Sequence, residues 1–442
     1  MTKKDTLTIG FMLFALFFGA GNLIYPPELG SQAGMNYWNA IAGFIITGVG
    51  LPIVAVTAIA FGSSDARSLG NRVHPLFGLI FTSAIYLAIG PFFGIPRAAN
   101  VAYEMGISPL VGSTSGSLWL FGFTIIFFAL VFWISLNPSK IVDRVGQWLT
   151  PVLLVAIVSL CVASFFNFDA PFQAASGNYT SGPLFQGFVN GYLTMDAIAG
   201  LAFGIIVVNA LKDRGVKPGK SMIKETIKAG LVTAAGLTFV YTSIGWMGAK
   251  MASLDSYDNG GDILSSGAEM LFGSAGALIL GLIVALACFT TCVGLTVACS
   301  QFFSSTFSKL KYTHVAFVVT VVSFSIANLG LNQIIAYSVP VLKFIYPLAI
   351  VLIILSFFHQ LFKGSSYVYR GALLFTLVFS IYDGLNAFGL KMESLENVLS
   401  IFPLFEKSLG WVVPALIGAV IGYLIDRNKN GTSMKASTRK AS

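Results

Sequence analysis

An apolar run near the amino terminus, residues 8–30, is interrupted in its middle. Residues 14–27 read FALFFGAGNLIYPP, so a strong helical signal meets Gly-Ala-Gly-Asn and then two prolines. Such a break leaves backbone N–H and C=O groups unpaired, and lipid cannot supply the missing partners. A break inside a membrane span is tolerated where it is buried in protein or lines a water-filled cavity. We therefore expect this segment to border a cavity.

The composition is that of a polytopic membrane protein. Of the 442 residues, 56% are hydrophobic and 10% are charged, whereas a soluble domain carries about 25% charged residues. A spanning helix needs about 20 apolar residues. We predict an all-helical chain with twelve spans, the first and sixth of them broken, at residues 8–30, 38–61, 74–104, 117–137, 147–168, 187–211, 226–250, 274–304, 313–330, 332–358, 368–389 and 402–425.

The positive charges predict the orientation of these spans. Lys and Arg are enriched in cytoplasmic loops, and the two ends plus every second loop, with their flanks, hold all but five of the 26 Lys and Arg. Both termini are therefore expected in the cytoplasm. The basic segments 212–228 and 426–442 suit an anionic lipid leaflet rather than nucleic acid. The exceptions are Arg97, Lys250, Lys343, Lys391 and Lys407.

The residues around the first break suit a helix that stops and restarts. Glycines in Gly19–Asn22 leave helical geometry at low steric cost. Pro26 and Pro27 suit the first turn of a new half-helix, which would place Glu28 in its positive amino-terminal turn. The alternative is a simple glycine kink that serves helix packing.

A restarted helix at this place offers backbone groups to a ligand. Carbonyls at the end of the preceding half-helix, near Ala15 and Phe18, suit a small cation or an ammonium group. First-turn N–H groups bind carboxylates. Here they would belong to Ala20, Gly21 and Asn22.

The sixth span carries a second glycine-rich break and an intramembrane carboxylate. The predicted break covers Thr194–Gly204 and includes Asp196, Gly200 and Gly204, and charged groups inside a membrane are expensive and functional by default. The alternative places Asp196 near the outer surface, in a loop ahead of the span. Interrupted helices at matching positions of two halves are the best sequence pointer to a transporter binding site.

Further polar groups lie in the third, eighth and tenth spans. Arg97 and Glu104 are two helical turns apart and on one face, so they are candidates for an outer gate or for orienting the site; the alternative is an arginine that snorkels to the interface. Two prolines and Lys343 suggest a kinked tenth span facing a cavity or partner. Asp383 is a candidate partner for this lysine.

The eighth span holds hydroxyl and carbonyl oxygens at a spacing that suits an alkali cation. Thr290 and Thr291 follow Ala287 by three and four residues. The alternative is that both hydroxyls bond to carbonyls one turn back, as threonines in membrane helices commonly do.

The remaining polar features do not indicate a metal site. The four cysteines lie in apolar runs and are expected to be small buried hydrophobes, and the three histidines are scattered. Segments 169–186 and 251–272 are long loops without Lys or Arg. The acidic residues of the second loop lack the spacing of an EF-hand, so we expect an acidic external loop.

These motifs together resemble the bacterial branched-chain amino acid:cation symporter family. The resemblance is carried by GAGNLIYPPELG in the first span, IGPFFGIPRAANVAYE in the third and SVPVLKFIYPLAI in the tenth, and it extends from Met1 to about Ile425. The family is assigned to the amino acid–polyamine–cation superfamily with the LeuT-like fold of two inverted five-helix repeats. The resemblance thus implies a bacterial cytoplasmic membrane protein with four parts, 1–168 and 169–358 as the repeats, 359–426 as spans 11 and 12, and 427–442 as a basic cytoplasmic tail.

The resemblance also implies a substrate site between the two breaks. Gly19–Asn22 would hold the carboxylate and amine, and Ala197–Phe203 would be the matching break. Leu23 and Phe203 flank the breaks and are candidates for an apolar wall. The full candidate set is Gly19, Ala20, Gly21, Asn22, Leu23, Ala197, Ile198, Gly200 and Phe203.

A sodium site follows from the same resemblance. The widely shared site of this fold would be formed by oxygens of Ala15, Phe18, Ala287, Thr290 and Thr291, which are suitable hard ligands. Two departures stand out. Tyr25 occupies the place where some sodium-coupled members carry a gating arginine, a role that Arg97 is placed to take over. Ile198 replaces the hydroxyl of a second sodium site, so one sodium is expected.

The sequence therefore predicts a sodium-coupled importer of leucine, isoleucine and valine in the lipid bilayer, with no other cofactor and no obligatory protein partner. A proton-coupled symporter that titrates Asp196 is the alternative. A channel lacks a filter segment, and an enzyme would need a clustered catalytic or metal set that the scattered His and Cys residues do not form.

Overall fold

The computed structural model describes residues 2–61, 65–108, 117–136, 140–390 and 392–439. All regular elements in these residues are helical, as the sequence predicts. The α-helices are α1 (Lys3–Phe17), α2 (Ala20–Ala33), α3 (Tyr37–Ile45), α4 (Leu51–Ala60), α5 (Ala66–Asn71), α6 (Pro75–Leu87), α7 (Gly94–Gly106), α9 (Ser117–Leu136), α10 (Lys140–Asn167), α11 (Pro183–Asn190), α12 (Asp196–Asp213), α13 (Lys220–Met251), α14 (Gly260–Thr306), α15 (Tyr312–Ala327), α16 (Leu331–Phe357), α17 (Ser366–Ala387), α18 (Glu393–Leu399) and α19 (Val412–Arg439). Short 3-10 or π segments join them, η1 (Gly34–Asn36), η2 (Ile46–Gly50), η3 (Ala88–Phe92), η4 (Gly177–Tyr179), η5 (Gly191–Thr194) and η6 (Phe405–Lys407).

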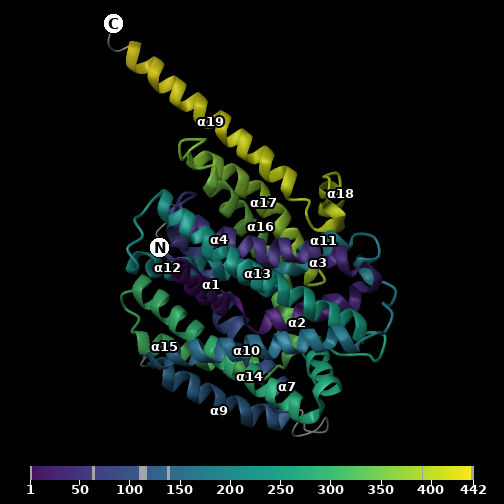
Figure 1. Cartoon of the computed structure of the whole chain (residues 1–442). Helices are drawn as coiled ribbons and strands as arrows, with labels where there is room; N and C mark the ends of the chain where they lie inside the picture. The colour runs from purple at the N-terminus through teal and green to yellow at the C-terminus, as the bar shows by residue number, and fades with distance from the viewer. Residues whose placement is uncertain (1, 62–64, 109–116, 137–139, 391, 440–442) are drawn as a thin grey trace.

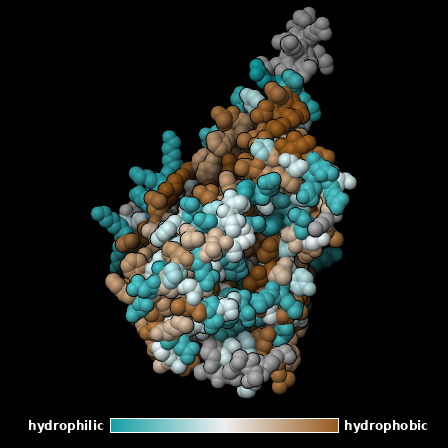
Figure 2. Space-filling view, turned by 90° about the vertical axis from the view of Figure 1, so that its right-hand side faces the viewer, coloured by the Kyte–Doolittle hydropathy of each residue, from teal (hydrophilic) through white to brown (hydrophobic). Residues whose placement is uncertain are grey.

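Several of these helices are long and apolar enough to cross a membrane. In the described part of the chain, seven meet the criterion, or eight if α11 with η5 and α12 form one span bent by 47°. Large apolar side chains are exposed on them, such as Leu118, Trp133 and Leu231. Figure 2 shows apolar surface gathered next to the projecting helix α19. Exposed apolar surface on this scale suits lipid rather than water, so the protein is a multi-pass membrane protein.

The helices pack through small residues that let backbones approach closely. Helix α14 lies along α7, α13 along α2, and α17 along α19 (Figure 1). A Cβ on Gly30 of α2 would overlap the carbonyl oxygen of Gly245 in α13. Glycine at such contacts permits the close approach on which membrane helix packing depends.

The chain leaves helical geometry between α1 and α2. Phe18 is extended (φ −72°, ψ 92°), and so is Gly19 (φ −127°, ψ −167°). The helix restarts at once, because the Gly19 carbonyl accepts the first new bond from the Asn22 N–H at 3.1 Å. The expectation that Pro26 and Pro27 begin the new helix is wrong, since both lie well inside α2. Glu28 is accordingly not in its first turn.

A second interruption separates η5 from α12. Met195 adopts the left-handed conformation (φ 66°, ψ 5°), and Asp196 begins α12. The predicted break at Ala197–Phe203 is therefore too late in the chain, because those residues are helical. Gly200 has a packing role, since a Cβ there would lie 2.8 Å from the Pro52 carbonyl oxygen of α4.

The predicted external loop 251–272 is helical from Gly260 onward. The Asn259 side chain accepts hydrogen bonds from the N–H groups of Gly261 (2.7 Å) and Asp262 (3.2 Å) and so caps the start of α14. Gly273 has a positive φ of 70° and marks a kink within α14. The turn ahead of the eighth predicted span is thus a capped helix rather than an irregular loop.

Candidate functional site

The two backbone breaks meet at a buried polar cluster. The Asn22 side chain donates a 2.6 Å hydrogen bond to Asp196 Oδ2. The hydroxyl of Tyr241, from α13, donates to the same carboxylate oxygen at 3.2 Å, and Asn22 also bonds to this hydroxyl. All three side chains are buried. Asp196 is therefore inside the protein at the start of α12, rather than in a surface loop.

Arg97 of α7 reaches into the same region. Its guanidinium donates to the Tyr25 hydroxyl (3.1 Å) and to the carbonyls of Leu193 (2.7 Å) and Thr194 (3.3 Å). The side chain is only 3% exposed, so it does not snorkel to the interface. By donating to these carbonyls Arg97 caps η5, because the last carbonyls of a helical segment have no partners within it.

Gly21 makes room for this guanidinium. An ideal Cβ on Gly21 would lie 2.5 Å from Arg97 Nη2 and 3.3 Å from the Thr194 Cα. The glycine of α2 thus lies directly against both the arginine and the end of η5. A side chain at Gly21 would therefore displace Arg97.

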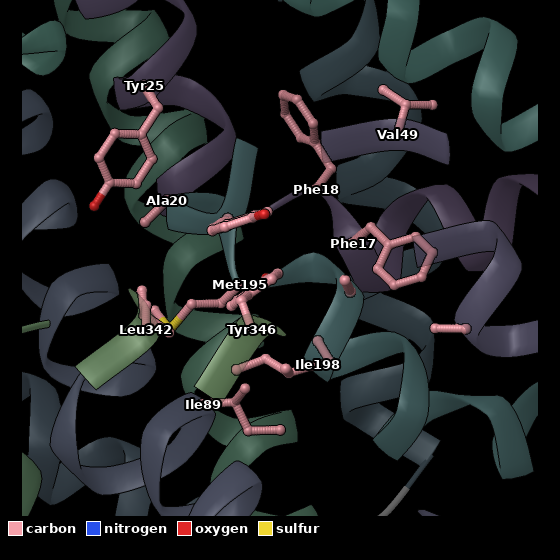
Figure 3. Close-up of a cluster of buried hydrophobic side chains, with 14 of the residues drawn as sticks. Phe17, Phe18, Ala20, Tyr25, Val49, Ile89, Met195, Ile198, Leu342 and Tyr346 are labelled. Carbon is pink, nitrogen blue, oxygen red and sulfur yellow. The ribbon is translucent and has the colours of Figure 1, made fainter. Parts of the chain in front are cut away.

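Apolar side chains from several elements surround the breaks (Figure 3). Met195 and Ile198 lie beside Tyr346 of α16, with Leu342 close to Met195. Tyr346 stacks on Tyr192 with ring centroids 4.7 Å apart. These residues form an apolar wall next to the polar cluster. Of the two wall residues predicted from sequence, Leu23 is buried, and Phe203 packs on Phe17 with ring centroids 6.4 Å apart.

The predicted cation ligands are in contact with each other on α14. The hydroxyls of Thr290 and Thr291 donate to the Ala287 carbonyl at 2.9 and 3.0 Å. This is the backbone bonding typical of threonine in membrane helices. The Thr291 methyl group lies 3.8 Å from the ideal Cβ position of Gly19. Thr291 therefore lies next to the first break, which begins at Phe18 after the last turn of α1, where Ala15 lies.

The predicted pairing of Lys343 with Asp383 does not form an ion pair. Ion pairs do form between Arg214 and Asp5 and between Lys228 and Glu225. Arg97 and Glu104, the candidates for an outer gate, are not in ion-pair contact with each other. Glu104 lies instead toward the start of α14, with Oε2 3.5 Å from the ideal Cβ position of Gly261. In the described chain, no three His, Cys, Asp or Glu side chains gather as metal ligands.

Sequence reasoning missed several residues of this site. Tyr241, Met195 and Tyr192 lie in apolar surroundings without a motif of their own, and Tyr346 lies in the tenth-span motif but had no predicted role. From sequence alone, a tyrosine in a membrane span cannot be distinguished from any other buried aromatic residue. Its role is visible only when folding brings a carboxylate to its hydroxyl. The left-handed Met195 carries no signal either, because this conformation normally favours glycine.

Solved transporters share this fold at low sequence identity. One is Mhp1, a nucleobase-cation-symport-1 family transporter, in a closed conformation with bromovinylhydantoin bound. It matches with a TM-score of 0.63 and 16% identity, over 97% of this chain and 93% of that one. Another is MhsT in complex with L-phenylalanine, with a TM-score of 0.56 and 15% identity, over 96% and 98% of the two chains. These likenesses concern the fold alone.

Curated relatives are much closer in sequence. The branched-chain amino acid permease BraB of Bacillus subtilis is 48% identical, over 96% of this chain and 95% of its own. BrnQ of the same organism, also a branched-chain amino acid permease, is 47% identical over 98% and 100%. The branched-chain amino acid transport system 2 carrier protein of Pseudomonas aeruginosa is 42% identical over 96% of each chain. These are names of transporters, not of enzymes.

A family model described as branched-chain amino acid transport protein matches residues 2–429. The match includes both backbone breaks, Arg97 and the α14 threonines. This chain belongs to the branched-chain amino acid transport protein family.

Proposed function

We propose that this chain is a secondary active transporter that imports leucine, isoleucine and valine by alternating access, driven by sodium. The observation that carries the proposal is the meeting of two backbone breaks through the 2.6 Å bond from Asn22 to Asp196. At this point the helix starts of α2 and α12 present first-turn N–H groups, which attract a carboxylate. The apolar wall of Met195, Ile198 and Tyr346 stands beside them.

The wall explains the proposed substrate class. An apolar pocket distinguishes side chains that differ by one methylene by only about 1–3 kcal/mol. Leucine, isoleucine and valine would therefore share one site. A charged side chain such as that of lysine would be excluded, because burying an unpaired charge is far more costly.

Sodium is proposed to bind between the end of α1 and α14. The ligands would be carbonyls of Ala15, Phe18 and Ala287 together with the hydroxyls of Thr290 and Thr291. Support comes from Thr291, which lies against Gly19 directly after the first break. A cation here would hold α1 and α14 together. It would thus favour one conformation, and coupling is the difference in ligand affinity between conformations.

The proposal includes a topology. We place twelve spans in the bacterial cytoplasmic membrane, with α1–α2 and α11–α12 as discontinuous first and sixth spans and with both termini in the cytoplasm. Spans one to five (1–168) and six to ten (169–358) would be inverted repeats. Residues 359–426 would add two spans, and 427–442 a basic tail. The asymmetric distribution of Lys and Arg supports this orientation.

Proton coupling is the second candidate, and Asp196 is the observation that favours it. This carboxyl group is buried at the junction of the two breaks and hydrogen-bonded to Asn22 and Tyr241. A group in this place that gains and loses a proton would change the bonds between α2, α12 and α13. It would couple a proton gradient to their movement.

Purified protein in liposomes tests the proposal. Radiolabelled leucine uptake is measured with a sodium gradient at uniform pH and with a pH gradient in sodium-free buffer. The expected result is uptake that requires the sodium gradient, is competed by isoleucine and valine, and is not competed by lysine. Uptake driven by the pH gradient without sodium would identify the proton, rather than sodium, as the coupling ion. The absence of leucine uptake under either gradient would refute the function.

A further inference from the structure

We infer that Arg97 and Asp196 together bind the charged ends of the substrate, Arg97 the carboxylate and Asp196 the ammonium group. This inference rests on the proposed function and deepens it, because it assigns zwitterion recognition to side-chain charges in addition to the backbone. Arg97 of α7 bonds to two carbonyls directly ahead of the Met195 break, and Asp196 begins α12 directly after it.

Arg97 is a buried cation with neutral partners. Its three hydrogen bonds go to the Tyr25 hydroxyl and to the carbonyls of Leu193 and Thr194. No carboxylate of the described residues lies within the 4.0 Å of an ion pair with it. Nε is buried and has no hydrogen-bond partner among the described residues. A buried charge without a counter-ion is costly, so an arriving carboxylate would be strongly favoured.

The arginine is also held in place for such a ligand. Its guanidinium carbon lies 5.3 Å from the Tyr25 ring centroid, and Nη2 lies against Gly21. The planar guanidinium matches a carboxylate with two parallel hydrogen bonds. It is therefore positioned where the first-turn N–H groups of α2 would hold the same carboxylate.

Asp196 supplies the opposite charge across the break. Its partners are the Asn22 amide and the Tyr241 hydroxyl, both on one oxygen, Oδ2. Thr194 links the two sites, because its carbonyl accepts from Arg97 and its hydroxyl accepts from the Asp196 N–H at 3.3 Å. The result is a positive and a negative group separated by a short backbone segment. This arrangement complements an α-amino acid, whose two charges are separated by one carbon.

The test uses leucine and two analogues that each lack one charge. Isoamylamine lacks the carboxylate, and 4-methylpentanoate lacks the amine. Each competes with radiolabelled leucine for binding to purified protein in detergent with sodium. The variants are Arg97→Gln and Asp196→Asn. The matched control is Arg370→Gln, because Arg370 also donates to a backbone carbonyl, that of Val73, but lies on α17.

Arg97→Gln is expected to weaken leucine binding by about 30-fold or more, with isoamylamine affinity changed less than threefold. Asp196→Asn is expected to weaken leucine binding comparably and to spare 4-methylpentanoate. Arg370→Gln should bind all three compounds as the wild type does. Wild-type leucine affinity in Arg97→Gln, or equal losses for leucine and isoamylamine, would overturn the inference.

Two further measurements test the inference if the Arg97→Gln variant does not fold. Tyr25→Phe removes a single bond to the guanidinium and should weaken leucine binding while sparing isoamylamine; an unchanged leucine affinity counts against the inference. In the wild type, isoamylamine that competes as well as leucine would refute carboxylate recognition outright. If the wild type binds and transports leucine and the Arg97→Gln variant binds leucine equally well, only this inference is refuted. Wild-type protein that does not transport leucine refutes the proposed function itself.

Discussion

The side-chain amide of Asn22 donates a 2.6 Å hydrogen bond to the carboxylate of Asp196, a residue 174 positions away in the chain. Each residue lies in the first turn of the helix that follows a backbone break. The bond therefore joins the starts of α2 and α12 inside the protein. Any rearrangement that moves these two helices apart must break it or replace it.

Asn22→Ala should lower the stability of the protein. The substitution leaves Tyr241 as the remaining side-chain partner of Asp196 Oδ2. Removing one partner of a buried polar group costs about 1–3 kcal/mol. We expect a lower melting temperature in detergent and reduced leucine uptake in liposomes.

A matched asparagine provides the control for this substitution. The Asn36 side chain donates to the Tyr179 carbonyl at 2.9 Å in a less buried setting, away from the breaks. Asn36→Ala should therefore lower the melting temperature less and leave uptake per folded molecule intact. Equal effects of the two substitutions would count against a special role for the Asn22–Asp196 bond.

Gly30→Ala should destabilise the contact between α2 and α13. The new methyl group would overlap the Gly245 carbonyl oxygen, which is backbone and cannot rotate away. Overpacking of this kind costs about 1–3 kcal/mol. Gly294→Ala is the comparison, because a Cβ at this exposed position of α14 meets no atom within 4 Å.

Gly294→Ala should raise stability, since alanine in a helix interior is favoured over glycine by about 0.5–1 kcal/mol. Thermal unfolding of both variants in the same detergent measures the difference. If Gly30→Ala melts at or above the wild-type temperature, the close approach of α2 and α13 is wrong.

His359 should make stability depend on pH. This residue follows α16 outside the membrane-spanning helices, and its ring Nδ1 lies 3.0 Å from the Tyr369 hydroxyl. Burial lowers the pKa of the His359 ring, and the charge of Arg72 lowers it further. The unfolded chain, with a histidine pKa of about 6.5, then binds more protons than the folded chain.

The sign of the effect follows from this difference. The contribution of His359 to stability is fully present above the unfolded-state pKa and is lost as the pH falls through the folded-state pKa. Melting temperatures between pH 8 and pH 5 should decline less in His359→Gln than in the wild type. An identical decline in both proteins would show that this ring is not the titrating group.

The sequence predicted a second break within Thr194–Gly204, but the narrower stretch Ala197–Phe203 that the resemblance implied is helical. Glycine is a reliable signal for a possible break because its backbone is permissive, yet it serves close helix contacts equally well. Gly200 is of the second kind, packed on Pro52. The break in the structure is at Met195, and methionine is not a residue type that indicates a left-handed backbone.

The predicted first break includes Gly19, where the backbone is extended, but the predicted restart at Pro26 is wrong. Phe18 and Gly19 are both extended, and α2 restarts directly after them, so the helix resumes before Pro26 rather than at it. The partners of Arg97 were equally hidden. They are backbone carbonyls of Leu193 and Thr194, which have no sequence signature and meet the arginine only in the folded chain.

The double substitution Thr290→Ala with Thr291→Ala should separate sodium binding from folding. Both hydroxyls bond to the Ala287 carbonyl, and the loss of such a bond changes stability by about 1 kcal/mol. If the two hydroxyls are sodium ligands, the sodium concentration for half-maximal leucine uptake should rise at least about tenfold, because two of five ligands are lost.

Thr296→Ala is the matched control for the double substitution. Thr296 lies on the same helix and makes the same kind of bond, from its hydroxyl to the Cys292 carbonyl at 2.8 Å, but it is not one of the proposed ligands. The Thr296→Ala variant should show the sodium dependence of the wild type. Its loss of stability should resemble that of a single substitution at Thr290 or Thr291. A double variant with wild-type sodium dependence would exclude these hydroxyls as ligands, and it would direct the search for the coupling ion to the carboxyl group of Asp196.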